Sequence, residues 1–254
     1  MTSIWADEAL TRDAFLGGRV TLLQPREGYR AGTDPVLLAA AIDATPGESV
    51  LEIGCGAGAA MICLAARVPE LDLSGVEVQP GYADLARRNA EANGIAASIH
   101  TADLRALPGA LKARRFDHVI ANPPYFDRSR SRPAPNPAKE TAFGAPLPLS
   151  EWIDAMARRV APGGRLWLIQ RADRLPEIFA ALHGRMGGLA VRPLVSRQGR
   201  DAERVLVTAR QSGRAAFRLA PPLVLHAGTR HVSDAADFTP EAESILRHGE
   251  KLRM

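Results

Sequence analysis

The chain has 254 residues, of which 46% are hydrophobic and 24% charged, and its formal net charge is +4. These values are ordinary for a globular protein of one or two domains, and no apolar run reaches the roughly 18 residues of a membrane span. The first fifteen residues carry acids where a secretory signal needs bases. The two cysteines, Cys55 and Cys63, provide neither a disulfide framework nor the spacing of metal ligands. We therefore expect a cytoplasmic protein that binds neither membrane nor metal.

Positive charge is concentrated late in the chain. Between Arg158 and Arg218 there are thirteen arginines and four acids, a net charge of +9, so the rest of the chain carries −5. A basic segment of this kind is typical of proteins that bind polyanions. Arginine outnumbers lysine 29 to 3, which leaves open the alternative that the arginines reflect genomic composition.

The first 45 residues are interpreted as an N-terminal extension that packs on the core. Residues 17–28 (GGRVTLLQPREG) predict a hairpin. Residues 34–42 (DPVLLAAAI) predict a short apolar helix, with Asp34 as its N-cap and Pro35 at the first helical position.

From residue 49 onward, strand patterns alternate with helix patterns. Strands are expected at 49–54, 72–78, 97–103 and 116–122, and helices at 59–68 and 81–94, the latter closed by Gly94. Strands separated by helices indicate βαβ units, and therefore a parallel, doubly wound sheet of the α/β class.

The second half interrupts this alternation and then resumes it. Residues 127–149 are rich in proline and basic residues, and we expect a long flexible loop there. A helix follows at 150–160, then a Pro-Gly-Gly turn, a strand at 165–170, a helix at 174–184 and an antiparallel strand pair at 189–196 and 203–210. Thr239 and Pro240 begin a last short helix. Residues 46–254 are thus predicted to form one domain, a mostly parallel seven-stranded sheet that ends in the antiparallel pair.

A glycine-rich turn marks the first predicted ligand site. Gly54, Gly56 and Gly58 lie between a strand and a helix, where glycines let the backbone approach a ligand closely. Glu77 and Asp103 end the next two strands, so both carboxylates are expected at the same edge of the sheet. This combination predicts a nucleoside cofactor, while the spacing of a dinucleotide site is absent.

Residues 30–210 resemble the class I S-adenosylmethionine-dependent methyltransferases, whose sheet is Rossmann-like. The resemblance rests on the acid Glu52 just before the glycine turn and on the order of the acids that follow. It implies S-adenosylmethionine as cofactor and S-adenosylhomocysteine as product. By the same resemblance, Glu77 would hold the ribose, and Asp103 with Leu104 would hold the adenine.

A second motif, Asn122-Pro123-Pro124-Tyr125, closes the fourth strand. It is the motif of methyltransferases that act on planar nitrogens, chiefly adenine amines and glutamine amides. Such a nitrogen is a weak nucleophile, since its lone pair is delocalised. The Asn122 side-chain oxygen and the Pro123 carbonyl would accept its N–H groups, aim it at the methyl group and stabilise the charge that develops on it. Tyr125 would stack on its plane, and the prolines make the turn rigid.

The substrate is expected to be an RNA loop, because a loop base is accessible without being flipped out of a duplex. The neighbours of the turn are the candidate substrate contacts: Asn122, Pro124, Tyr125, Phe126, Arg128, Arg130 and Lys139.

The chain from Phe15 to Arg247 also resembles the bacterial family that N6-methylates adenine 37 in valine tRNA, next to the anticodon. The resemblance rests on FLGGRVTLLQPREGYRAGTDPVLLAAAI, on NPPYF with SRPAPNPAKETAF, and on PPLVLH with FTPEAESILR. It implies a tRNA partner, a monomer or homodimer, and cofactor contacts from Arg30, Thr33 and Asp34. Two alternatives stay open: methylation of ribosomal RNA, protein glutamine or a small molecule, and a nucleic-acid-binding module with a relic cofactor fold.

Overall fold

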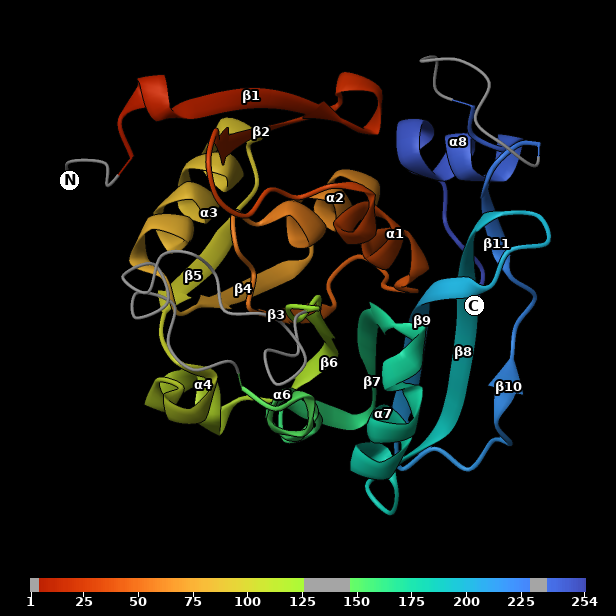
Figure 1. Ribbon diagram of the computed structural model, residues 1–254. Coiled ribbons are helices and arrows are strands. Elements are labelled where there is room, and N and C mark those ends of the chain that lie inside the picture. Colours follow the sequence, from red (N-terminus) through yellow and green to blue (C-terminus); the bar gives the residue numbers. More distant parts are fainter. Residues whose placement is uncertain (1–4, 126–146, 229–236) are drawn as a thin grey trace, which may run out of the picture.

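The computed structural model describes residues 5–125, 147–228 and 237–254 (Figure 1). Within these residues the main element is a nine-stranded sheet with the strand order β10-β8-β9-β7-β6-β3-β4-β5, in which β11 also pairs with β8. Its strands are β3 (Ser49–Ile53), β4 (Asp72–Glu77), β5 (Ala97–Thr101), β6 (Phe116–Ala121), β7 (Val160–Arg171), β8 (Met186–Arg197), β9 (Ala202–Gln211), β10 (Arg218–Leu219) and β11 (Leu223–His226).

The predicted sheet is confirmed in its direction and its class. Strands β3 to β7 run parallel to their neighbours, and β9 lies antiparallel between β7 and β8. The seven predicted strands are joined by two short ones, β10 and β11, which both run parallel to β8 at its outer side. The sheet therefore extends beyond the antiparallel pair.

Helices cover both faces of this sheet (Figure 1). Adjacent residues of β3 show why it carries apolar side chains on both faces: Val50 packs into one hydrophobic cluster and Leu51 into the other. The first cluster includes α1 (Thr33–Ala41), α2 (Ala59–Arg67), α3 (Pro80–Ala92) and α8 (Pro240–His248). The second includes α4 (Gly109–Ala113), α6 (Leu149–Ala157) and α7 (Leu175–Leu182).

The N-terminal hairpin forms a sheet of its own. Strands β1 (Leu10–Phe15) and β2 (Val20–Pro25) pair antiparallel, and the short 3-10 turn η2 (Leu16–Gly18) joins them. The hairpin is confirmed, although its first strand lies before the predicted stretch. Two side-chain amides of α3 bond the backbone of β2: Asn89 pairs with Leu23 and Asn93 with Thr21.

Local details differ from the sequence-based expectations at two places. Helix α1 begins at Thr33 with Gly32 at its N-cap, so the prediction that Asp34 caps it is wrong. The reason is that the Asp34 carboxylate bonds two distant side chains instead of its own helix. The Pro-Gly-Gly turn lies inside β7, where the register against β6 shifts and absorbs the extra residues.

Other expectations hold or fall outside the described residues. Thr239 caps α8 as predicted, with its hydroxyl oxygen 3.2 Å from the Ala242 N–H nitrogen. Most of the predicted loop 127–149 lies outside the described residues, and with it Phe126, Arg128, Arg130 and Lys139. No helix of the described chain is both long enough and apolar enough to cross a bilayer.

Candidate active site

The glycine turn joins β3 to α2 at the carboxyl edge of the sheet. Gly54, Gly56 and Gly58 all have left-handed φ angles, of 71°, 53° and 85°. The N–H groups of Gly54 and Cys55 both donate to the Val76 carbonyl of β4, at 2.7 and 3.0 Å. The turn is therefore held against the neighbouring strand in a conformation that favours glycine.

Gly54 also has no room for a side chain. A Cβ atom there would lie 2.5 Å from the Trp152 Cη2 atom, so the indole of α6 rests directly on the glycine backbone. Trp152 was not among the predicted site residues. A glycine at position 54 is thus required twice, by its φ angle and by this close approach.

Glu77 ends β4 and faces the glycine turn. Its two carboxylate oxygens accept from the N–H groups of Gly56 and Gln79, each at 2.9 Å. The residue is 7% exposed, and burial raises the pKa of its carboxyl group. The turn and the acid are therefore one hydrogen-bonded unit, although the sequence separates them by 21 positions.

Glu52 lies deeper, near the end of strand β3 and just before the glycines. It is 3% exposed, and its Oε2 accepts from the Met61 N–H in the first turn of α2 at 3.0 Å. Burial raises the pKa of Glu52 to about 8, against the opposing effect of the Met61 hydrogen bond. Near pH 7 this acid is therefore largely protonated, and its observed contact is with the helix N-terminus.

Asp103 follows β5 at the same edge. It caps the 3-10 turn η3 (Leu104–Ala106), accepting from the Arg105 N–H at 2.8 Å. The Arg105 guanidinium also binds it at 2.6 Å, and that hydrogen bond lowers the pKa of the Asp103 carboxyl group. Asp103 is thus ionised at neutral pH, with Leu104 partly buried beside it.

The segment that leads into α1 lies over the glycine turn. A Cβ atom at Gly56 would be 3.7 Å from the Tyr29 ring, and Tyr29 is 55% exposed. The Arg30 guanidinium points away to the hairpin, where it binds the Asp13 carboxylate at 2.6 Å and the Pro25 carbonyl at 2.8 Å. Arg30 therefore anchors the segment, while Thr33 begins α1 beside it.

The Asn-Pro-Pro-Tyr turn follows β6, the strand next to β3. Ile120 pairs with Glu52, so Asn122 and the glycine turn extend from neighbouring strand ends. Asn122 is half-buried, and none of the described residues bonds its side-chain amide. The carbonyl of the buried Pro123 faces the Gln170 amide nitrogen of β7 at 3.5 Å. A half-buried amide that no described residue bonds is a group available to a ligand.

Tyr125 connects this turn to α1. Its hydroxyl donates to the Asp34 Oδ2 atom at 2.5 Å, and burial together with the Asp34 charge raises the pKa of the phenol. The Arg204 guanidinium of β9 forms an ion pair with the other oxygen of Asp34. Asp34 thus joins the Asn122 turn to α1, and its second partner, Arg204, was not among the predicted site residues.

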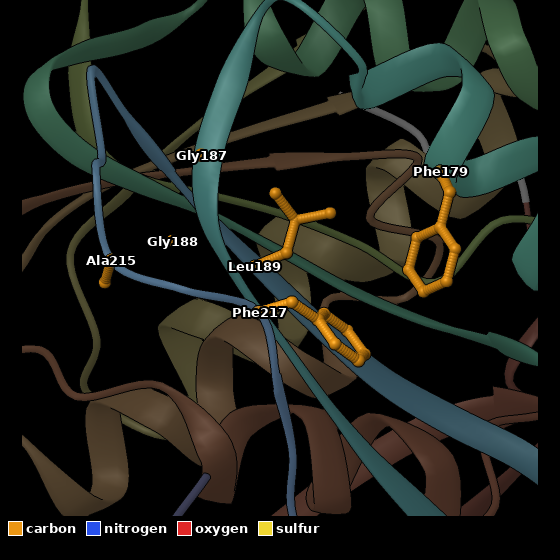
Figure 2. Close-up of a pocket in the computed structure, with 6 residues that line it drawn as sticks. All are labelled: Phe179, Gly187, Gly188, Leu189, Ala215 and Phe217. Atoms are coloured by element: carbon orange, nitrogen blue, oxygen red, sulfur yellow. The ribbon is translucent and has the colours of Figure 1, made fainter.

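Two further features lie apart from this site. His118 is 4% exposed and is bonded by the Trp167 indole at 3.0 Å and by Glu48 at 3.1 Å, so both of its ring nitrogens have protein partners. An apolar cavity of about 280 Å³ lies at the opposite edge of the sheet, where β8 begins (Figure 2). Figure 2 shows the rings of Phe179 and Phe217 beside Leu189, and the cavity lining offers no reactive group.

The acceptor groups of the site lie together at the carboxyl edge of the sheet. The glycine turn allows close backbone approach, with the Glu77 carboxylate against it. The Asp103 carboxylate is paired with Arg105, and that of Asp34 with Arg204. Within the described residues, no three His, Cys, Asp or Glu side chains are grouped so that they could hold a metal ion.

The amino-acid sequence is similar to a family of methyltransferases and to named methyltransferases. Residues 31–187 match the family model for the methyltransferase small domain. The tRNA1(Val) (adenine(37)-N6)-methyltransferase of Porphyromonas gingivalis strain ATCC 33277 is 34% identical over 175 residues, which cover 65% of this chain and 68% of that protein. The protein of the same name from Actinobacillus succinogenes is 28% identical over 204 residues, 77% of this chain and 83% of that one.

Solved structures share the fold. A predicted O-methyltransferase from Agrobacterium tumefaciens superposes with a TM-score of 0.68 at 28% identity, over 87% of this chain and 99% of that one. The 16S rRNA N2 G1207 methyltransferase of Thermus thermophilus, in complex with AdoMet and guanosine, gives a TM-score of 0.56 at 19% identity, over 80% and 50% of the two chains.

Proposed function

Because this chain belongs to the methyltransferase small-domain family, we propose that it transfers a methyl group from S-adenosylmethionine to the N6 amine of an adenine in tRNA. The observation that carries the proposal is the half-buried amide of Asn122, unbonded by the described residues and one strand away from the glycine turn. The curated relatives favour adenine 37, in the anticodon loop of valine tRNA, as the base.

The cofactor would supply an electrophilic methyl group on a sulfonium ion. Glu77 is the proposed partner of its ribose hydroxyls, since it lies buried against the glycine turn. Asp103 and Leu104 are the proposed adenine contacts, and Thr33 and Asp34 those of the methionine part. Arg30 and Glu52 are already bonded to the hairpin and to α2, so we propose that they act by holding the site in shape.

The chain's own part in the reaction is to bind and orient the amine. The Asn122 side-chain oxygen and the Pro123 carbonyl would accept the two N–H groups of the base. These hydrogen bonds strengthen as positive charge develops on the nitrogen, so they stabilise the transition state more than the ground state. Tyr125 would stack on the base, a contact worth roughly 1–3 kcal/mol. The proton leaves after the amine has become cationic, so the scheme needs no strong general base.

The proposal is tested with Asn122→Ala, using labelled S-adenosylmethionine and bulk tRNA from a strain that lacks the enzyme. We expect methyl transfer to be abolished, while the cofactor affinity measured by calorimetry stays near that of the wild type. Asn93→Ala, at the half-buried C-cap of α3, is the matched control and should retain activity. Turnover that survived Asn122→Ala would contradict the role of that side chain.

Mapping the labelled nucleoside in the same experiment tests the substrate. Label in N6-methyladenine of tRNA is the expected outcome. Label in protein, or in ribosomal RNA alone, would replace the tRNA proposal by one of the alternatives left open by the motif. Absence of cofactor binding would instead favour an RNA-binding module without activity.

A further inference from the structure

The Asp34 carboxylate is shared by two side chains from distant parts of the chain. Its Oδ2 accepts the Tyr125 hydroxyl at 2.5 Å, and its Oδ1 is bonded by the Arg204 guanidinium. The partners are 91 and 170 positions away in sequence. The Asp34 side chain is 14% exposed and that of Arg204 26%, so water screens this ion pair only partly.

Arg204 is fixed by the sheet rather than by a loop. It lies in β9, in register with Arg171 of β7 on one side and Leu194 of β8 on the other. Asp34, by contrast, lies in the first turn of α1, and Tyr125 follows the turn after β6. Arg204 and Asp34 thus both lie on regular elements, so the ion pair between them holds the carboxylate in a defined place beside the less regular turn that carries Tyr125.

The hydroxyl of Tyr125 has this carboxylate as its partner among the described residues. A hydrogen bond to the hydroxyl oxygen fixes the long axis of the tyrosine ring, because that oxygen lies on the line from Cβ through Cγ and its position depends on the first side-chain torsion angle. Rotation about this line leaves the oxygen in place, but the phenolic O–H lies in the ring plane when it points at its acceptor, so the direction of Asp34 also favours one ring orientation. Without Arg204 the partly buried carboxylate would lack its counter-ion and would move toward water. The ring would then lose a charge-assisted hydrogen bond and adopt other orientations.

We propose that Arg204 is a positioning residue for methyl transfer: by holding Asp34, it anchors the Tyr125 ring on which the substrate base stacks. The inference rests on the proposed function. Arg204 touches neither reacting group in this scheme and acts only through the two side chains between it and the base. Its effect is therefore on the orientation of bound substrate, and it requires the Tyr125 hydroxyl.

The test is a double-mutant cycle between Arg204→Gln and Tyr125→Phe, measured as single-turnover methyl transfer to tRNA. Phenylalanine keeps the stacking ring and removes the hydroxyl. Arg204→Gln should lower the rate by about tenfold or more, because misplacing a group in an active site costs up to about 10²-fold. In the Tyr125→Phe background the same change should have almost no further effect.

Two more variants serve as controls for the double-mutant cycle. Arg171→Gln removes the arginine directly opposite on β7, which is exposed and paired with Asp173, and it should leave the rate unchanged. Arg204→Lys retains the charge without the planar fork and should lose part of the rate, again only when the Tyr125 hydroxyl is present. Thermal unfolding of each variant verifies that it is folded.

The outcomes separate this inference from the proposed function. If Arg204→Gln lowers the rate equally in the wild-type and Tyr125→Phe backgrounds, Arg204 acts structurally and the inference is wrong. A wild-type rate in Arg204→Gln also overturns it, even where Asn122→Ala is inactive. Activity of Asn122→Ala would instead overturn the proposed function itself.

Discussion

The contact between Gly54 and Trp152 gives a prediction whose size follows from the structure. In Gly54→Ala, the new methyl group must adopt a left-handed backbone with φ of 71°, which costs an L-residue about 1–2 kcal/mol. It must also displace the indole, because the Cβ position lies 2.5 Å from Cη2 and 2.7 Å from Cζ3. Overpacking of this kind typically costs about 1–3 kcal/mol. We therefore expect a loss of about 2–5 kcal/mol in the free energy of unfolding.

The strain and the clash can be measured separately. Gly184 has a φ angle of 72°, and a Cβ atom there would meet nothing within 4 Å, so Gly184→Ala reports the backbone strain alone. In a Trp152→Leu background the clash at Gly54 is relieved, and Gly54→Ala should cost no more than Gly184→Ala. The assay is urea unfolding followed by far-UV circular dichroism, which does not depend on the removed tryptophan. An equal cost for Gly54→Ala in both backgrounds would refute the argument from the indole contact.

Two further predictions concern the stability of the fold. Asn89 and Asn93 make the same amide pair with β2, but Asn89 is fully buried and also donates to the Ala57 carbonyl. In urea unfolding, Asn89→Ala should therefore lower the free energy of unfolding by about 1–3 kcal/mol and Asn93→Ala by clearly less, and similar losses would contradict the role of burial. Burial raises the pKa of Glu52 to about 8, so the contribution of its protonated form to stability is complete below about pH 4.5 and is lost as the pH rises through 8. The free energy of unfolding of the wild type relative to Glu52→Gln should therefore fall between pH 5 and 8, by at most about 1.4 kcal/mol per pH unit. A constant difference would show that Glu52 stays ionised.

The parallel core was predictable because its strands are buried on both faces. In β3, Val50 and Leu51 enter different clusters, and such strands are recognised in sequence as continuous apolar runs bounded by turns. The short strands β10 and β11 gave no such signal, since they have two and four residues and Pro221 and Pro222 separate them. Strand β1 was missed because only Leu10 in it is buried, so its sequence does not alternate between apolar and polar.

The site was predictable only where its residues are close in sequence. The glycine turn and the Asn122 turn are local patterns whose residue types have direct physical reasons. Trp152, Gln170 and Arg204 act through contacts with partners 98, 47 and 170 positions away, and nothing in their own neighbourhoods identifies them. Asp34 shows the same limit: its position favoured an N-cap, but the fold supplies a phenol and a guanidinium that bind it instead.

In the folded chain, much of the positive charge of the Arg158–Arg218 segment is already paired with acids. Its excess of +9 and the −5 of the remainder partly neutralise each other, because six of its arginines pair with acids outside the segment. These pairs are Arg158–Asp154, Arg165–Asp43, Arg185–Asp154, Arg192–Glu241, Arg197–Asp237 and Arg204–Asp34. By contrast, Arg200 and Arg214 are exposed and have no ion pair with the described residues. A polyanion gains most from cations that lack an internal partner, so the segment charge overstates the number of phosphates that these arginines can bind.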